Sequence, residues 1–350
     1  MHMADALISP TVGLTMIAVT AGIGAYSSKK IENEMDDKKI PLMGVMGAFV
    51  FATQMINFTI PATGSSGHLG GGILLAALLG PYAGFLTMAA ILLVQALFFG
   101  DGGLLAYGCN VFNMAFYTCF IAFPLIYKSI IRNGFTTKRI FIASTLAALI
   151  GLQLGAFSVV LETLSSGKIE LPFATFLIMM QPIHFAIGLV EGLVTATILN
   201  FVWKARPELL EKAFTGEAIG TTYVVRLLRF FVIAALVVGG SLSWFASARP
   251  DGLEWSMERV AGTAELTSTG SIHKFFSEIQ EKATFLPDYN FKTTDNASSA
   301  EEEQSWPSVS IGTSISGILG GVLTCALATA IGFFANAFKR RNNVSASKQA

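Results

Sequence analysis

Long apolar runs separated by short polar connections dominate this chain of 350 residues. Apolar runs of about 18 or more residues are candidates for membrane-spanning helices, which need about 20 residues to cross a hydrocarbon core of roughly 30 Å. The pattern therefore predicts an all-α, polytopic membrane protein. The predicted helical segments are 8–26, 41–60, 68–80, 81–99, 104–128, 138–161, 173–203, 223–246 and 309–337.

Basic residues in the polar connections predict the orientation of these segments. Connections rich in Lys and Arg face the cytoplasm by the positive-inside rule. Four regions are basic, and their residues are Lys29, Lys30, Lys38, Lys39, Lys128, Arg132, Lys138, Arg139, Lys204, Arg206, Lys212, Arg226, Arg229, Lys339, Arg340, Arg341 and Lys348. These four regions are expected inside, which places 61–67 outside.

This orientation requires an odd number of crossings between 61–67 and Lys128. A single helix over 68–99 would give an even number, whereas a break at Gly80-Pro81 makes two helices and satisfies the requirement. Proline suits the first turn of a helix, so the break is natural there. The first of the two helices is short and is expected to begin within 61–67.

The segments group into two predicted units. Residues 1–203 form a seven-helix unit with its N-terminus outside, 204–222 form a cytoplasmic linker, and 223–350 form a two-helix unit. The last hairpin encloses an external segment, 247–308, which is polar and includes the acidic run 301–303. We expect this segment to be a small, partly ordered domain or a mobile loop.

Composition agrees with a membrane location. Hydrophobic residues make up 53% of the chain and charged residues 13%, against about 25% charged residues in soluble domains. The net charge is zero, which gives no reason to expect a nucleic-acid partner.

The cysteines and the start of the chain carry no signal of their own. Cys109, Cys119 and Cys325 lie in apolar runs and are expected to be buried packing residues. The start of the chain lacks a basic leader, so Met1 is expected to be the mature N-terminus.

The N-terminus and one distant histidine form a candidate metal site. The amine of Met1, the backbone nitrogen of His2 and the His2 imidazole can chelate one ion, and the imidazole of His68 would supply a fourth nitrogen. Four nitrogens in a plane suit Ni(II) or Cu(II). Histidine and amine must lose protons to bind, so affinity is expected to fall below roughly pH 6. Alternatively, His2 is there by chance and His68 only bonds a neighbouring helix.

Other polar residues fall inside predicted helices. Asn110 and Asn113 share one helix face, and so do His184 and Glu191, with Gln181 nearby. Ionisable groups inside a membrane are candidates for function. They could line an exit route or brace helices through hydrogen bonds, and we leave them outside the predicted metal site.

A third pattern suggests a protease, and two absent motifs narrow the possibilities. Gly64-Ser65-Ser66-Gly67 matches the Gly-x-Ser-Gly pattern of rhomboid-type intramembrane proteases, with His184 as a possible base. Its place in an outer glycine-rich turn argues against this.

Two motifs are absent from the sequence. The chain has no Gly-x-x-x-x-Gly-Lys-[Ser/Thr] motif of P-loop ATPases and no His-Glu-x-x-His motif of zinc metalloproteases, so neither activity is supported. We expect no enzyme activity.

Several motifs, in order along the chain, resemble the CbiM/NikM family, the metal-binding membrane subunits of energy-coupling-factor transporters for nickel and cobalt. The segment 250–254, Pro-Asp-Gly-Leu-Glu, separately resembles the signature of the family's small two-helix partner, which is often fused behind the first subunit. The motifs that carry the first resemblance are 1–7 (MHMADAL), 64–68 (GSSGH), 78–83 (LLGPYA), 95–103 (QALFFGDGG) and 108–114 (GCNVFNM).

The resemblance implies a seven-helix metal-binding subunit in a prokaryotic plasma membrane, with its N-terminus outside. It implies that Met1, His2 and His68 hold the transported ion, Ni²⁺ or Co²⁺, with no further cofactor. It also implies a separate transmembrane coupling protein and cytoplasmic P-loop ATPases as partners. The start Met-His-Met-Ala-Asp-Ala is more similar to nickel members than to cobalt members, which favours nickel.

Two other classes stay open at this point. One is the intramembrane serine protease, using Ser65 or Ser66 with His184. The other is a membrane metal sensor that signals through its cytoplasmic loops. Sensitivity of metal binding to extension at Met1 would separate the transporter from the protease.

Overall fold

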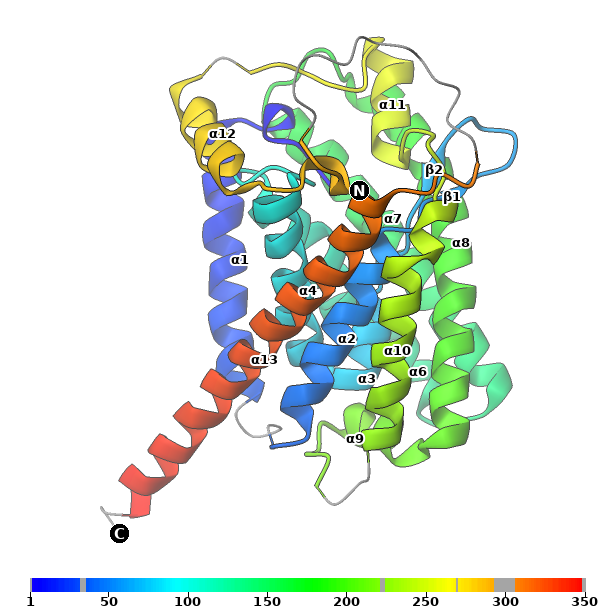
Figure 1. Cartoon of the computed structure of the whole chain (residues 1–350), viewed down its shortest axis with the longest axis vertical. Helices are drawn as coiled ribbons and strands as arrows, with labels where there is room; N and C mark the ends of the chain where they lie inside the picture. The colour runs from blue at the N-terminus through cyan, green and yellow to red at the C-terminus, as the bar shows by residue number, and fades with distance from the viewer. Residues whose placement is uncertain (1, 32–35, 221–223, 269, 293–305, 348–350) are drawn as a thin grey trace.

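The structure is a computed structural model of the whole chain, and it is an all-helical bundle with one small hairpin of strands (Figure 1). It describes residues 2–31, 36–220, 224–268, 270–292 and 306–347, with side chains up to 337. The expectation of a helical membrane protein is confirmed. Six helices in the described part of the chain are long and apolar enough to cross a membrane. They are Pro10–Ile31, Pro81–Phe99, Tyr107–Ile131, Thr137–Ser165, Phe173–Ala205 and Ile311–Ala337.

Three further predicted segments contain shorter apolar helices: α2 (Lys39–Gln54), α3 (Gly72–Leu79) and α10 (Val225–Gly240). The six longer spans are α1 (Pro10–Ile31), α4 (Pro81–Val94) with η2 (Gln95–Phe99), α5 (Tyr107–Val111) with η3 (Phe112–Tyr127) and α6 (Lys128–Ile131), α7 (Thr137–Ser165), α8 (Phe173–Ala205) and α13 (Ile311–Ser347). The remaining elements are η1 (Asp5–Leu7), β1 (Phe58–Thr59), β2 (Ser66–Gly67), α9 (Pro207–Thr215), η4 (Leu242–Phe245), α11 (Gly252–Ala261), α12 (Ser271–Ala283) and η5 (Pro287–Tyr289).

The predicted break between the third and fourth segments is confirmed. Helix α3 ends at Leu79, Gly80 has φ 83°, and α4 begins at Pro81. All eight residues of α3 are buried, so protein rather than lipid surrounds this short helix. The expectation that it begins within 61–67 is wrong, because 66–67 pairs with 58–59 as a hairpin and α3 starts only at Gly72.

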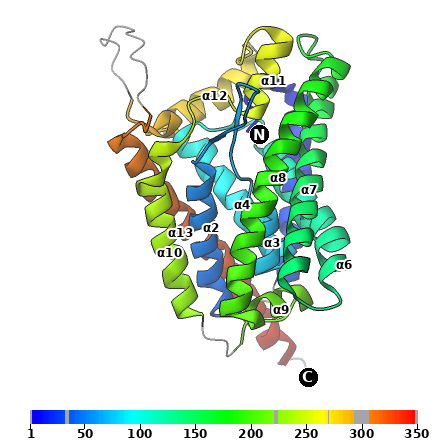
Figure 2. The ribbon, with the colours of Figure 1, turned by 90° about the vertical axis from the view of Figure 1, so that its right-hand side faces the viewer.

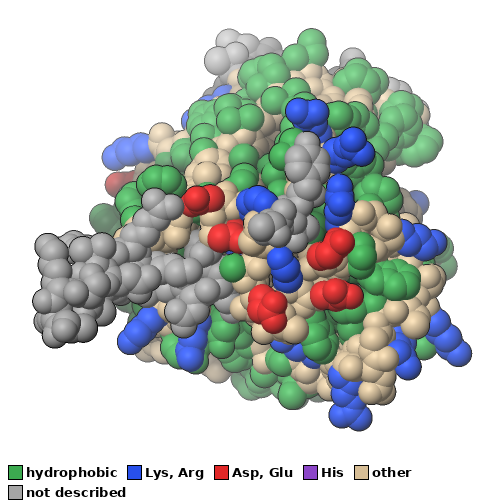
Figure 3. Space-filling view, turned by 90° about the horizontal axis from the view of Figure 1, so that it is seen from below, with side chains coloured by type: hydrophobic (Ala, Val, Ile, Leu, Met, Phe, Trp, Pro, Cys, Tyr) green, Lys and Arg blue, Asp and Glu red, His purple; other side chains and the backbone are tan. Residues whose placement is uncertain are grey.

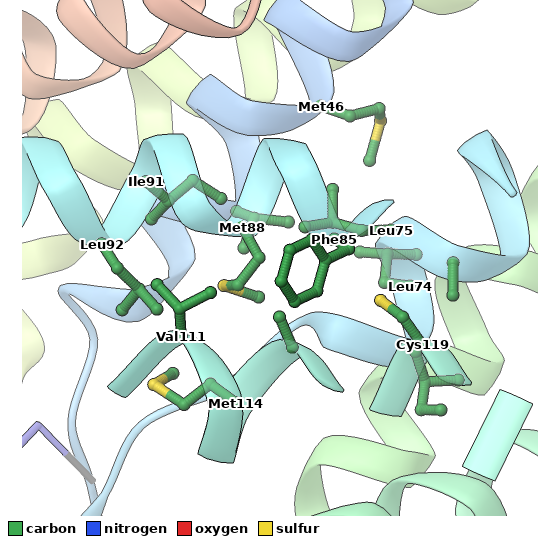
Figure 4. Packing of buried hydrophobic residues seen from close by; sticks show 14 of the residues in the cluster. Met46, Leu74, Leu75, Phe85, Met88, Ile91, Leu92, Val111, Met114 and Cys119 are labelled. Atoms are coloured by element: carbon green, nitrogen blue, oxygen red, sulfur yellow. The ribbon is translucent and has the colours of Figure 1, made fainter. Parts of the chain in front are cut away.

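The core is close-packed and apolar. Figure 4 shows Met88 and Phe85 of α4 between Leu74 and Leu75 of α3 and Val111 and Met114 of the next span. Cys109 and Cys119 are buried, as expected, and Cys325 is half-buried. Large apolar side chains remain exposed on the outward faces of the long helices, as expected for surfaces that face lipid. They include Leu14, Ile150, Ile178, Leu193, Ile233 and Val322.

Helices α10 and α13 pack together and against α2 (Figure 2). Where α10 meets α13 the backbones nearly touch, since a Cβ atom added to Gly317 would lie 2.2 Å from the carbonyl oxygen of Gly239. Small residues permit such close approach of helices in membranes.

The described residues of the segment predicted to be external include two helices, α11 and α12. Helices α11 and α12 lie across one end of the bundle, which we call the upper end, and α9 lies at the other (Figure 1). The capping box of Asp251 and Glu254 explains why α11 begins where it does. The acidic run 301–303 falls outside the described residues.

Basic side chains gather at the lower end. Figure 3 shows Lys and Arg around this face, with a few acidic side chains nearer its centre. Lys29 and Lys30 end α1, Lys39 begins α2, and Lys128 opens α6. The placement agrees with the grouping of basic connections that the sequence predicts, and it makes the upper end the expected outer face.

Candidate metal site

The N-terminal segment lies inside the upper end of the bundle. Met3 is fully buried, and its backbone N–H donates to Asn110 Oδ1 at 2.7 Å while Asn110 Nδ2 donates to the Met3 carbonyl at 3.1 Å. The amide of Gly103 donates to the same carbonyl at 2.8 Å. A little further on, the Asp5 carboxylate accepts from the Ala106 amide at 2.9 Å. These bonds fix the chain direction on either side of Met3.

His2 is oriented by a chain of amide side chains. Its Nε2 lies 3.1 Å from Gln95 Oε1, Gln95 Nε2 donates to Gln54 Oε1 at 2.9 Å, and Gln54 Nε2 donates to the Gly70 carbonyl at 2.7 Å. Because Gln95 offers its oxygen to the ring, His2 carries its proton on Nε2 and has its lone pair on Nδ1. A nitrogen oriented in this way by a second hydrogen bond is typical of metal-binding histidines.

The lone pair of His2 faces a carboxylate. Its Nδ1 lies 3.3 Å from Asp101 Oδ1. Burial nonetheless lowers the pKa of His2, so the neutral ring prevails at pH 7. A lone pair and a carboxylate at this distance repel each other unless a cation, either a proton or a metal ion, lies near both.

The structure brings His68 to His2 across 66 positions of sequence. The two imidazole rings are stacked with their centroids 5.0 Å apart and their planes 21° apart. His68 Nδ1 lies 3.2 Å from the carbonyl oxygen of Leu69 and is the donor there, which leaves Nε2 as its acceptor nitrogen. Burial lowers the pKa of His68 to about 3, so this ring also is neutral. Met1, the third predicted ligand, lies outside the described residues.

The second unit covers this pair of histidines. The Ser66 amide donates to the Pro250 carbonyl at 2.8 Å, and Trp255 Nε1 donates to the Thr63 carbonyl at 3.0 Å. These contacts place Asp251 beside the site. Burial would raise the pKa of the Asp251 carboxyl, but attraction to nearby basic groups and the hydrogen bond from the Glu254 amide hold that pKa well below its usual range. The side chain is therefore a carboxylate.

A cavity of about 490 Å³ leads to the two histidines from the upper end. Its described lining contains six carboxylates and no Lys or Arg side chain, so it attracts cations. The acidic residues are Asp5, Asp101, Asp251, Glu254, Glu265 and Asp288. The described part of the chain contains no cluster of three or more His, Cys, Asp or Glu side chains arranged around a metal position.

The residues of the alternative protease site are engaged elsewhere. Ser66 Oγ donates to the Arg249 carbonyl at 2.7 Å, and Ser65 Oγ lies near the carbonyls of Ser66 and Pro250. His184 Nδ1 bonds the Met180 carbonyl at 2.8 Å. Among the hydrogen bonds of the described residues, none joins either serine to His184, so the structure gives the dyad no support.

Sequence reasoning alone gave no role to several residues at this site. Gln95 and Asp101 lie in one of the motifs that carry the family resemblance, and Asp251 lies in another, yet their contacts with the histidines required the fold. Gln54 lies in an apolar helix with no motif around it. The only signal for it was an amide side chain within a membrane segment.

Comparison with known proteins agrees with a multi-pass membrane protein of metal transport. Residues 2–209 match the family model for the CbiM cobalt uptake substrate-specific transmembrane region, and residues 225–337 match that for the PDGLE domain. The chain therefore belongs to the CbiM family of nickel and cobalt transport proteins, with a PDGLE domain fused behind it.

Relatives over most of the chain are described as metal transport proteins rather than enzymes. A putative fused nickel transport protein NikMN of Archaeoglobus fulgidus is 30% identical, covering 95% of this chain and 98% of its own. A cobalt transport protein CbiM of Geobacter sulfurreducens is 26% identical over 69% of this chain and 72% of its own. A crystal structure of a truncated transition metal transporter has a TM-score of 0.52 at 28% identity, covering 59% of this chain and 99% of that one.

Proposed function

We propose that the chain is the metal-capturing subunit of an energy-coupling-factor importer for divalent nickel in a prokaryotic plasma membrane. The ion is held by the Met1 amine, the backbone nitrogen and imidazole of His2, and the imidazole of His68. The observation that carries this proposal is the stacked pair of neutral, partly buried imidazoles from His2 and His68, with His2 oriented by Gln95.

Charge at the site supports a divalent cation as cargo. Binding through the backbone nitrogen of His2 displaces its proton, which leaves a complex with one net positive charge. The carboxylates of Asp101 and Asp251 lie beside the histidines and offset that charge. The acidic cavity above them would gather cations from the outer face before they bind.

Nickel is favoured over cobalt by the donor set. A deprotonated peptide nitrogen is a strong-field donor, and four nitrogens in a plane suit d⁸ nickel. The fused relatives named as nickel transport proteins include that of Rhodobacter capsulatus, 30% identical over 75% of this chain. Cobalt uptake is the second candidate, since the family model itself is named for cobalt.

Uptake requires partners that this chain does not encode. We propose that a separate transmembrane coupling protein and cytoplasmic P-loop ATPases drive release of the ion to the inside. The basic lower end is the expected face for these partners, with the N-terminus on the opposite, outer side. The metal-sensor alternative differs in needing no ATPase.

The test is the metal content of the full chain, purified in detergent with an unmodified Met1. About one nickel per chain is expected, with loss in His2→Ala, in His68→Ala and in a chain extended by one residue before Met1. His273→Ala is the matched control, because His273 bonds the Ile8 carbonyl outside the site and should keep its nickel. Nickel retained by the extended chain would reject this ligand set, and preferential binding of cobalt would shift the cargo to cobalt.

A further inference from the structure

A second, smaller cavity lies next to His68 inside the bundle, between η3 and α8. Its volume is about 20 Å³, enough for one particle the size of a water molecule. His68 is part of its wall, and so are Asn113, His184 and Glu191. Because His68 also borders the larger cavity, the two cavities adjoin the same histidine.

Two acceptor atoms in the wall have no partner among the described residues. His184 donates from Nδ1 to the Met180 carbonyl at 2.8 Å, so its lone pair is on Nε2, and that atom is buried without a hydrogen bond. Asn113 donates from Nδ2 to Glu162 Oε2 at 2.8 Å, which leaves Oδ1 buried and without a donor. Both side chains are 1% exposed. Two buried acceptors without donors destabilise the empty cavity.

An acidic side chain in the wall distinguishes a cation from a neutral guest. Glu191 lies in the same wall, two helical turns further along α8 than His184, and it is 1% exposed. Its two oxygens accept from the amides of Gly70 at 2.8 Å and Gly71 at 3.0 Å. The described lining contains no Lys or Arg, so no fixed basic side chain neutralises Glu191 within the cavity.

We propose that this cavity is a second, transient site for the divalent cation, with His184 Nε2 and Asn113 Oδ1 as donors and Glu191 as the compensating charge. The proposal rests on the proposed function, since the ion comes from His2 and His68. A mixed nitrogen and oxygen set binds nickel more weakly than four nitrogens do. The lower affinity of the second site suits transfer, because an intermediate site must accept the ion and also let it leave.

The first experiment measures nickel binding to the full chain by equilibrium dialysis at rising nickel concentration. Wild type is expected to bind one tight and one weaker equivalent. His184→Ala should lose the weaker equivalent and keep the tight one, which also shows that this variant is folded. His273→Ala, which changes the remaining histidine of the chain, should keep both.

The outcomes separate this inference from the proposed function. His68→Ala should lose the tight equivalent and keep the weaker one. A His68→Ala protein that keeps tight binding would reject the proposed function but leave the second site to be judged by His184→Ala. A single equivalent in wild type, or a weaker equivalent that survives in His184→Ala, would overturn the second site.

A second measurement uses wild type alone, in case His184→Ala fails to fold. Crystals of the full chain soaked with rising nickel are expected to show anomalous scattering within bonding distance of His184 Nε2 and Asn113 Oδ1. A peak only at His2 and His68, with water or nothing in the cavity, would overturn the proposal.

Discussion

Asn110 pairs with both backbone polar groups of Met3, accepting from its N–H at 2.7 Å and donating to its carbonyl at 3.1 Å. The side-chain amide thereby replaces the partner that a neighbouring strand would supply. Because Met3 directly follows His2, this pairing sets where the first residues of the chain lie. Asn110 is thus a positioning residue for the proposed site, although it does not contact the metal.

Asn110→Ala is expected to weaken nickel binding by about 10- to 100-fold, since the buried N–H of Met3 loses its partner at a cost of about 1–3 kcal/mol, while the Met3 carbonyl keeps the bond from the Gly103 amide. Calorimetric titration of the purified protein measures this. Asn133→Ala serves as the control, because Asn133 is exposed in the loop at the lower end. Unchanged affinity in Asn110→Ala would mean that the segment is held by other contacts.

Gln95→Leu should weaken nickel binding by about 10- to 100-fold, the range seen when the outer hydrogen-bond partner of a metal-binding histidine is lost. The change removes the acceptor for His2 Nε2 and the donor to Gln54, while the helix stays apolar. The matched control is Gln153→Leu, which removes a side-chain hydrogen bond from α7 to the Gln181 carbonyl of α8 and lies outside the lining of the cavity at His2. Equal losses in the two variants would point to general destabilisation rather than to orientation of His2.

The break at Gly80-Pro81 and most helix positions could be predicted because they depend on local pattern: apolar run length, glycine and proline. The meeting of His2 with His68 was predicted only through the expected topology and the family resemblance. The positions of α11 and α12 within 247–308 could not be predicted, because helix α11 is stabilised by docking. Its Trp255 bonds the Thr63 carbonyl, which is distant in sequence.

The second cavity shows a different limit. Asn113 and His184 were recognisable as polar residues in apolar helices, and either bracing or an exit route explained them equally well. The tautomer of His184 and the unpaired oxygen of Asn113 depend on bonds to Met180 and Glu162. The bond from Asn113 to Glu162 joins two helices, and the spacing of residues along one helix does not reveal it.

Metal retention should persist to lower pH in the protein than in a free peptide with the sequence of residues 1–6. At the imidazole, a proton competes with the metal only below the pKa of the ring, which is about 6.5 for an unperturbed histidine. Burial lowers the pKa of His2 and brings that of His68 to about 3, so proton competition begins at lower pH. The fall below roughly pH 6 expected from the sequence should therefore describe the peptide, with the midpoint for the protein lying lower.

Peptide and protein share the amine and the backbone nitrogen of residue 2, so a difference in midpoint reports on the imidazoles: that of His2 in its protein environment and that of His68, which the peptide lacks. Nickel bound at equilibrium is measured from pH 7.5 down to pH 4 for both. Coinciding midpoints would show that the buried environment does not protect His2 and His68 from protons.

Asp251→Asn tests the electrostatic contribution of the second unit without removing its helix cap. Asparagine caps helices about as well as aspartate, so the bonds to the amides of Leu253 and Glu254 should remain and α11 should stay in place. The carboxylate charge beside His68 is lost, and nickel affinity should fall about tenfold as that charge no longer offsets the bound ion.

Glu258→Gln on the same helix is the control for a charge change, since Glu258 is exposed and is not part of the cavity lining. Nickel affinity and thermal unfolding are measured together for both variants. A drop in affinity with an unchanged unfolding temperature in Asp251→Asn alone supports the charge effect, whereas equal affinity in the two variants would limit the second unit to covering the site.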